Sequence, residues 1–213
     1  MDLSLLIILV FFIIVSLLAL SRLYDNVGER RRIFENIASK RKGKVALEKY
    51  LKLIIPYKDR EVILSFEKRW ITSRIGHPET TLNRVSVVSF QFDGEINYQF
   101  QIVIKDVAAK MAFGMLDGML KGMSDRTGIQ LQSNSSLEDF IFLSPNPVFA
   151  RDFLSSRIQQ CLLQLKDSQP VVKFEKGHFE LLVHRKLRTE EEWEDLLNRG
   201  QLLIDRLFEL NIF

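Results

Sequence analysis

The stretch SVVSFQFDGEINYQFQIVI, residues 86–104, alternates apolar and polar side chains over most of its length. Apolar residues occupy every second position from Val88 to Phe92, and they return in the same rhythm from Ile96 to Ile104. A period of two places all of these side chains on one face of a strand. Asp93-Gly94 between the two runs is a favoured two-residue hairpin turn. The stretch therefore predicts an antiparallel hairpin that is buried on one face.

Shorter strand signals flank this segment on both sides. Leu53 to Ile55 and Glu61 to Trp70 predict a hairpin around a Pro56–Asp59 turn, and Val62, Leu64, Phe66 and Trp70 share one parity. Val171–Phe174 and Phe179–Val183 predict a second hairpin across Lys176-Gly177. Single strands are expected at 129–132 and 140–143.

Two helices have clear start signals in the second half of the chain. Asn146 is a cap residue followed by Pro147, and an apolar stripe then runs through Leu154, Ile158, Cys161, Leu162 and Leu165. Thr189 with Glu192 forms a capping box before a helix with a second apolar face. Hairpins accompanied by separate helices predict an α+β domain.

The N-terminus carries a different signal. Leu3 to Leu20 is an 18-residue run without a charged side chain. As a helix it is about 27 Å long, close to the thickness of a bilayer core of about 30 Å. The first residues include Asp2 and no cation, which is untypical of a cleaved signal peptide. We expect residues 1–23 to be a retained transmembrane anchor.

The segment after this run is strongly basic. Residues 22–44 carry eight Lys or Arg side chains and three acidic ones. Cations beside a span mark its cytoplasmic side, so the body of the chain is expected in the cytoplasm of a single-pass membrane protein. Residues 24–44 are predicted to form a basic juxtamembrane helix and linker. The side chains expected to contact the membrane surface are Arg30, Arg31, Arg32, Lys40, Arg41 and Lys42.

Charge and cysteine content narrow the class of protein. Of the net charge of +3, residues 22–44 contribute +5 and Asp2 contributes −1, so the body after Lys44 has a net charge of −1. A nearly neutral body lacks the basic face that nucleic acid requires, and no nucleic-acid partner is expected. Cys161 is the single cysteine, which excludes an intrachain disulfide and fits a reducing compartment.

Several features together resemble a bacterial family of single-anchor membrane proteins with a cytoplasmic α+β domain. They are the anchor with its basic helix, the extended hairpin region, SSLEDFIFLSPNP at 135–147, and VVKFEKGHFELLVHRKLRTEEEWEDLLNRGQLLIDRLF at 171–208. The resemblance covers roughly the last half of the chain and the anchor, and its motifs consist of turn and core residues. It implies a fold but no activity, so no functional residue is carried over.

A methionine- and glycine-rich segment, KMAFGMLDGMLKGMSDR at 110–126, belongs to a helix predicted over residues 106–123. Each glycine costs about 1 kcal/mol of helix stability relative to alanine, so a compensating contact is expected. Three interpretations stay open: packing on the sheet, contact with a second copy in a homo-oligomer, or an adaptable partner surface. The candidate interaction residues here are Gly114, Gly118, Gly122, Met115 and Met119.

Residues with recognisable chemistry are scarce. The chain has no P-loop, nucleophile elbow, zinc-protease or dinucleotide motif, so neither a cofactor nor a metal is expected and an enzyme is disfavoured. His178 and His184 are expected on the exposed polar face of the last hairpin, and Cys161 in the core. A long loop is predicted at 72–84, where Arg74, His77 and Arg84 are candidate ligand residues.

These observations lead to one functional hypothesis and one alternative. The hypothesis is a membrane-tethered, cytoplasm-facing binding or scaffold module without catalytic activity. Its partner surface is the amide-rich outer face of the 86–104 hairpin, with Gln91, Asn97, Gln99 and Gln101. The alternative is a small-ligand sensor or enzyme that uses the loop 72–84. Residues 45–126 and 127–213 are expected to form one continuous domain.

Overall fold

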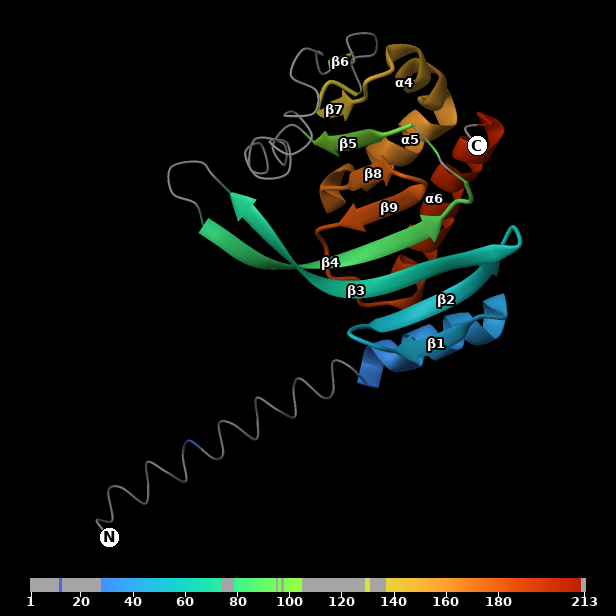
Figure 1. Cartoon of the computed structure of the whole chain (residues 1–213). Coiled ribbons are helices and arrows are strands. Elements are labelled where there is room, and N and C mark those ends of the chain that lie inside the picture. Colours follow the sequence, from blue (N-terminus) through green and yellow to red (C-terminus); the bar gives the residue numbers. More distant parts are fainter. Residues whose placement is uncertain are drawn as a thin grey trace.

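The computed structural model describes residues 12, 28–73, 79–94, 96, 98–104, 129–130 and 137–211. In this part of the chain, nine strands form one antiparallel sheet in the order β1-β2-β3-β4-β9-β8-β5-β7-β6 (Figure 1). The strands are β1 (Lys44–Leu47), β2 (Leu51–Tyr57), β3 (Arg60–Ser73), β4 (Glu79–Gln91), β5 (Phe100–Ile104), β6 (Ile129–Gln130), β7 (Phe140–Leu143), β8 (Val171–Glu175) and β9 (His178–Val183). The helices are 28–41, α4 (Pro147–Phe153), α5 (Ser156–Leu165), the short 3-10 helix η1 (Lys166–Ser168) and α6 (Glu190–Glu209). The predicted α+β class is confirmed.

The predicted hairpins at 53–70 and 171–183 are both present. β2 pairs with β3 around Lys58-Asp59, where both residues have positive φ, and β8 pairs with β9 around Lys176-Gly177. Positive φ at both central residues gives a turn whose twist matches that of the flanking strands. Tight turns and one-sided burial are local properties, which is why the sequence reveals them.

The prediction of a long loop at 72–84 is wrong. β3 and β4 stay paired from Val62↔Phe90 to Ser73↔Glu79, so Arg84 lies within a strand and only residues 74–78 connect the two strands. The threonine- and arginine-rich sequence lacks the apolar alternation of a half-buried strand, and this concealed the extension. Arg74 and His77 lie outside the described residues.

The predicted hairpin over 86–104 is also wrong in its pairing. β4 pairs with β9 and β5 pairs with β8, so the β8–β9 hairpin separates the two strands. The Phe92 amide donates to the Gly177 carbonyl at 2.8 Å, which joins the end of β4 to the β8–β9 turn. Alternating burial identifies a strand with one covered face, but it does not identify the strand's neighbour.

A layer of helices covers one face of the sheet. Figure 1 shows α5 and α6 behind the strands, and the helix 28–41 lies beside β1 and β2 at one end. Gly200 of α6 lets the helix approach β4 closely, since a Cβ at this position would lie 2.6 Å from Cγ1 of Val88. Phe34 of the helix 28–41 packs edge-on against Trp193 of α6, with ring centroids 4.9 Å apart. The first and last described helices thus share one core.

The start signals of α4 and α6 are confirmed. Asn146 accepts hydrogen bonds from the amides of Val148 and Phe149, and Thr189 and Glu192 form the predicted capping box. The helix expected after Pro147 is divided at Leu154-Ser155 into α4 and α5. The predicted stripe from Leu154 to Leu165 is buried in the sheet-facing layer.

Several predictions fall outside the described residues. They concern the membrane anchor, of which only Phe12 is described, the Met/Gly-rich helix with Gly114, Gly118, Gly122, Met115 and Met119, and Asn97. Within the described ranges, no helix combines the length and hydropathy needed to cross a bilayer. The strand expected at 129–132 is described at 129–130.

Candidate functional site

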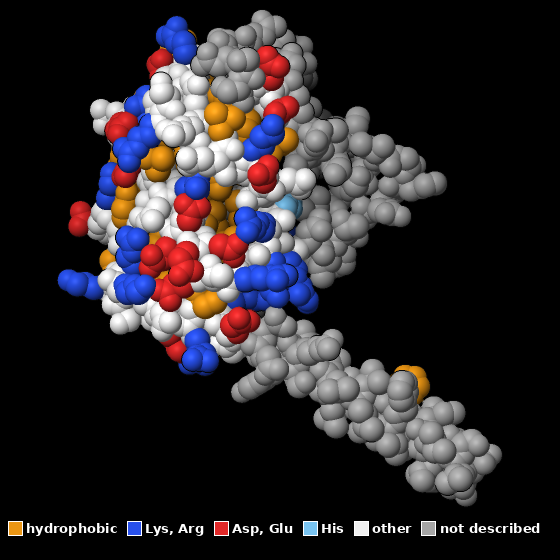
Figure 2. All heavy atoms as spheres, turned by 180° about the vertical axis from the view of Figure 1, so that it is seen from behind, with side chains coloured by type: hydrophobic (Ala, Val, Ile, Leu, Met, Phe, Trp, Pro, Cys, Tyr) orange, Lys and Arg blue, Asp and Glu red, His pale blue; other side chains and the backbone are white. Residues whose placement is uncertain are grey.

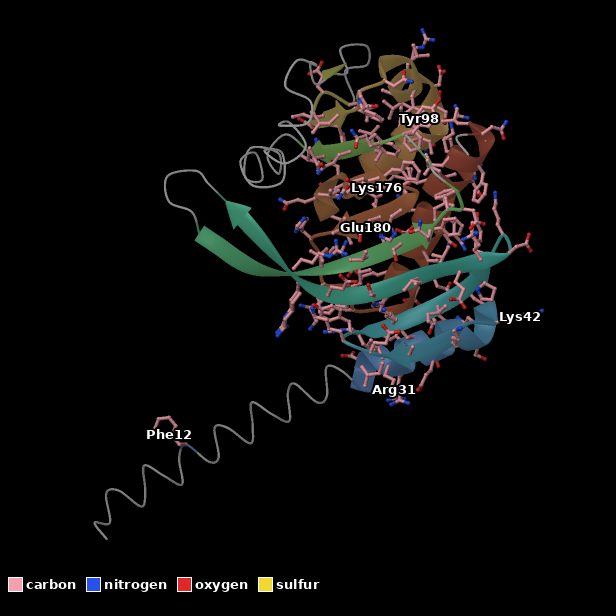
Figure 3. All side chains as sticks on the ribbon, in the orientation of Figure 1. Phe12, Arg31, Lys42, Tyr98, Lys176 and Glu180 are labelled. Atoms are coloured by element: carbon pink, nitrogen blue, oxygen red, sulfur yellow. The ribbon has the colours of Figure 1, made fainter. Side chains whose placement is uncertain are left out.

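A band of polar side chains crosses four strands on the face of the sheet opposite α6. Its first row follows the register Gln91↔His178↔Glu175, and its second row follows Ser89↔Glu180↔Lys173↔Gln101. These positions alternate with Val88, which meets Gly200 of α6, and therefore point to the other face. Figure 3 shows Glu180 near the middle of the sheet. We call these seven residues the polar band.

Arg69 of β3 links this band to β3, the strand that neighbours β4 on the side away from β9. Its guanidinium contacts both carboxylate oxygens of Glu180, with Nη1–Oε2 at 3.0 Å and Nη2–Oε1 at 2.7 Å. Its Nε donates to Glu67 at 2.9 Å, and Ser65 donates to the same carboxylate at 2.6 Å. Bidentate pairing of this kind holds both partners in a fixed orientation.

The charges of this network stabilise one another. Burial of Glu180 opposes its ionisation, but hydrogen bonds from His178 and Arg69 outweigh that effect and lower the pKa of the carboxyl to about 2. Hydrogen bonds to Glu180 raise the pKa of Arg69. Both groups are therefore ionised across the physiological range, and Glu180 has no proton to donate as a general acid.

Gln91 and His178 form the exposed end of the band. The Nδ1 atom of His178 lies 3.2 Å from Oε1 of Gln91, and its Nε2 atom lies 3.4 Å from Oε1 of Glu180. Lys173 pairs with Glu175 at 2.7 Å. The cations and carboxylates of the band are thus paired across its surface, and the amide and imidazole groups stand at its edge.

The predicted amide surface is present in altered form. Gln91 is exposed on β4 and Gln99 is half-buried just before β5, whereas Gln101 is only 4% exposed. The glutamines do share one face, as their spacing predicts, but β9 and β8 separate Gln91 from the other two. His178 is exposed as expected. The Nε2 atom of His184 is instead buried without a hydrogen-bond partner among the described residues, and burial lowers the pKa of that imidazole.

Cys161 lies beneath a hollow between α5 and α6. The hollow has a volume of about 320 Å³ and is lined by polar side chains that include Arg157, Asp195 and Arg199. Burial raises the pKa of the Cys161 thiol to about 11, so the nucleophilic thiolate is scarce at neutral pH. The predicted core role of this cysteine is confirmed. Within the described ranges, no three His, Cys, Asp or Glu side chains converge as metal ligands.

The residues predicted to contact a membrane surface fall into three groups. Lys40 pairs with Glu190, and Arg41 donates to Asn198 at 2.9 Å, so both are engaged by α6. Arg31 pairs with Glu35 within the helix 28–41 at 2.8 Å, and Arg32 and Lys42 are exposed. Arg30 instead lies over the ring of Phe66, at 3.8 Å from the centroid.

Arg30 and Arg84 are candidate residues from two separate predictions, and the structure brings them together. Arg84 of β4 lies near enough for its charge to act on the Arg30 guanidinium. Lys186 and Arg188, which follow β9, line a hollow with Arg30. Sequence reasoning missed these two cations, although the basic run RKLR at 185–188 was a visible signal.

No protein-family model matches the chain, and no curated protein matches it.

Proposed function

We propose that this chain is a membrane-tethered, cytoplasm-facing binding module that presents the polar band to a protein partner and has no catalytic activity. The observation that carries the proposal is the pairing of charge in the band and beside it on β3. Arg69 binds Glu67 and Glu180, and Lys173 binds Glu175. Such a face offers many hydrogen-bonding groups but has no large excess of positive or negative charge. A rigid, polar and nearly balanced surface suits specific protein recognition.

The tether rests on the sequence. The run from Leu3 to Leu20 has the length and composition of a single span, and the basic residues of 22–44 favour the cytoplasmic side for everything that follows. The membrane would then hold the module at a fixed location, where a second membrane-associated protein reaches it at raised effective concentration.

The state of the titratable groups supports binding over catalysis. Glu180 is held ionised by His178 and Arg69, and Cys161 is held protonated by burial. A general acid needs a proton to donate and a cysteine nucleophile needs a thiolate, and at neutral pH neither group is in the required state.

Position-specific photo-crosslinking in intact membranes tests the proposal. A photoreactive amino acid replaces His178 at the exposed edge of the band, or Arg157 on α5 as a control in the helix layer. We expect a discrete protein adduct from position 178 and none from position 157. The adduct should still form when the membranes are washed with salt before irradiation, but not when detergent dissolves the membrane and the proteins are diluted before irradiation.

Two results would contradict this function. Recovery of the full-length chain from the soluble fraction without detergent would remove the tether. A rise of several degrees in the unfolding midpoint with one particular metabolite would instead favour the small-ligand alternative.

A further inference from the structure

One edge of the sheet is formed by β1, which directly follows the helix 28–41 (Figure 1). Among the described strands, β1 pairs with β2 alone. Lys44 and Leu47 on β1 are exposed, and so are Glu48 and Lys49 just beyond it. The outer edge of β1 is therefore accessible, and an accessible edge can pair with an additional strand.

The backbone of β1 determines which residues such a strand would meet. The amide of Glu48 donates to the carbonyl oxygen of Tyr50 at 3.2 Å, so Glu48 turns its backbone toward the β2 side. Successive residues of a strand direct their N–H and C=O groups to opposite edges. The backbone of Ala46 therefore also faces β2, whereas the backbone groups of Val45 and Leu47 point away from the sheet.

The side chains of β1 set two further requirements. Val45 is opposite Leu53 in the β1–β2 register and packs against the core on the helix-covered face. Leu47 lies on the same face but is 69% exposed, so most of its apolar surface contacts water. Ala46 and the charged Lys44 lie on the other face. An edge partner thus needs an apolar residue opposite Leu47 and an opposite charge near Lys44.

A second copy of β1 meets both requirements. When two β1 strands pair antiparallel about Ala46, Val45 of each copy lies opposite Leu47 of the other. In the same register Lys44 lies opposite Glu48 of the other copy, at both ends of the contact. Since the backbone groups of Val45 and Leu47 both point outward, each pair of these residues exchanges two hydrogen bonds. The strand is therefore complementary to itself.

Charge and size both select this register. Sliding one strand by two positions places Lys44 opposite Ala46 or Tyr50, and the charge match is lost. The two Ala46 residues form a non-hydrogen-bonded pair on the two-fold axis, where the Cα atoms are only about 4.5 Å apart. A methyl side chain allows this close approach. Lys44 alone would protect the edge from pairing, but Glu48 of the second copy compensates its charge.

The charged side chains are accessible for this contact. Lys44 pairs with Glu61 and Glu48 pairs with Lys52, yet the side chains of Lys44 and Glu48 remain 65% and 63% exposed. An ammonium and a carboxylate each have room for more than one hydrogen bond, so alternating charges can continue across the contact. Figure 2 also shows basic and acidic side chains mixed at the end of the body that carries the helix 28–41. Two copies can therefore meet there without opposing fields of one sign.

The symmetry of the pairing suits two chains in one membrane. Directly opposed side chains share a face, so the two-fold axis through the Ala46 pair is perpendicular to the sheet. The helices 28–41 of both copies then lie on the same side of the joined sheet, which is compatible with chains that enter from one membrane. A contact of one short strand is smaller than a standard interface, so it depends on the raised local concentration that a tether supplies.

We propose that β1 is a homodimer interface, in which the edge strands of two copies pair antiparallel about Ala46 and join two sheets into one. The pairing rests on the tether of the proposed function for its concentration, but it does not involve the polar band. It goes beyond that function because it assigns a second copy of this chain to a different edge of the molecule. The joined sheet would present two polar bands on one face.

The test uses the full-length chain reconstituted into phosphatidylcholine vesicles. Ala46→Cys places one thiol of each copy at the two-fold axis, where the Cα separation suits a disulfide. The control Lys49→Cys places the two thiols six strand positions apart, about 20 Å. Cys161 is buried and stays in both variants, and the parent chain measures its contribution. Dimers formed under mild oxidation are quantified on a non-reducing gel. We expect a dimer with Ala46→Cys and none with Lys49→Cys.

Two charge reversals in the Ala46→Cys background test the register. Lys44→Glu creates two like-charge pairs in its homodimer, and Glu48→Lys does the same with the opposite sign. We expect each to slow disulfide formation about tenfold, because both contacts change from attraction to repulsion. Mixing the two variants, one with a longer tag, pairs every Glu with a Lys. The mixed dimer should therefore form at the rate of the Ala46→Cys chain without reversals.

Several outcomes would overturn the proposal. No disulfide at position 46, or equal yields at positions 46 and 49, would show that the strands do not pair about Ala46. A mixture that fails to restore the rate would show that the copies meet through another register or surface.

Two measurements keep a negative result interpretable. The unfolding midpoint of each variant is compared with that of the parent, and energy transfer between two labelled pools of the charge variants replaces the disulfide if Ala46→Cys is unfolded. Membrane fractionation and the adduct at position 178 are followed in parallel. If these persist while the dimer is absent, the β1 interface is wrong and the binding module stands.

Discussion

Arg30 and Arg69 are two half-buried arginines that lie against opposite faces of β3. Arg69 binds the carboxylates of Glu67 and Glu180, and hydrogen bonds to Glu180 raise its pKa. Arg30 lies over Phe66, and desolvation and the charge of Arg84 lower its pKa. The same type of side chain is therefore part of a structural ion-pair network on one face of β3, and lies close to another cation on the other face.

This contrast distinguishes a charge that supports the fold from one that is available to a ligand. A buried charge with a complete set of partners stabilises its neighbours, and removing one partner leaves the others exposed to the full cost of burial. A cation surrounded by cations contributes little to stability but attracts an external anion. Mutation of the two arginines should accordingly change the stability of the chain by very different amounts.

The largest effect is expected for Arg69→Ala. The substitution leaves Glu180, whose side chain is 15% exposed, without its bidentate partner, and we expect a loss of about 3 kcal/mol in the free energy of unfolding. For a chain of this size that corresponds to a fall of roughly 6–12 °C in the unfolding midpoint. Thermal unfolding of the full-length chain in detergent measures it.

Arg60→Ala is the matched control for that substitution. Arg60 also lies on β3, but its partner Asp93 is 82% exposed, so its ion pair is worth about 1 kcal/mol or less. Similar losses in the two variants would contradict the structural role assigned to Arg69.

The second prediction concerns acid. Glu180 has a pKa of about 2 in the folded chain, below its ordinary value of about 4.3 in an unfolded chain. A depressed folded pKa gives stability that is complete above about pH 5 and is lost as the pH falls toward 2. We expect about 2–3 kcal/mol to disappear over this interval, and Glu180→Gln to flatten the dependence of the unfolding midpoint on pH. An equally steep profile in that variant would show that other carboxylates govern acid unfolding.

The sequence reveals those parts of the fold that depend on neighbouring residues. The Lys58-Asp59 and Lys176-Gly177 turns, the capping box at Thr189 and the buried stripe around Cys161 all follow from local geometry. Each depends only on an apolar face, on the φ angles of two adjacent turn residues, or on hydrogen bonds between residues three positions apart. These are the elements that sequence reasoning placed correctly.

The pairing of distant strands was not predictable in this way. The segment 86–104 has the expected alternation, yet β4 pairs with β9 some ninety residues later in the chain. Asp93-Gly94 permits a tight turn. In the structure, however, the β8–β9 hairpin lies between β4 and β5, and Phe92 and Ile96 are buried near its turn. A single sequence carries no local signal that distinguishes these two solutions.

The candidate site is non-local for the same reason. Arg69 and Glu180 are 111 positions apart, and Arg30, Arg84 and Lys186 come from three separate segments. Their residue types were visible in the sequence, and RKLR at 185–188 could have been singled out as a basic run. Their convergence depends on the pairing of β3, β4 and β9, which the alternation pattern does not encode.

The smallest effect is expected for Arg30→Ala, and it tests the other side of the comparison. Loss of the cation–π contact with Phe66 costs roughly 0.5–1 kcal/mol, while removal of a charge near Arg84 offsets part of that loss. The unfolding midpoint should therefore fall by only about 1–3 °C, far less than for Arg69→Ala. Raising the salt concentration should stabilise the parent chain slightly more than this variant, because screening weakens a repulsion that the variant no longer has. A loss as large as that of Arg69→Ala would mean that Arg30 is a structural residue, and the contrast between the two arginines would lose its main support.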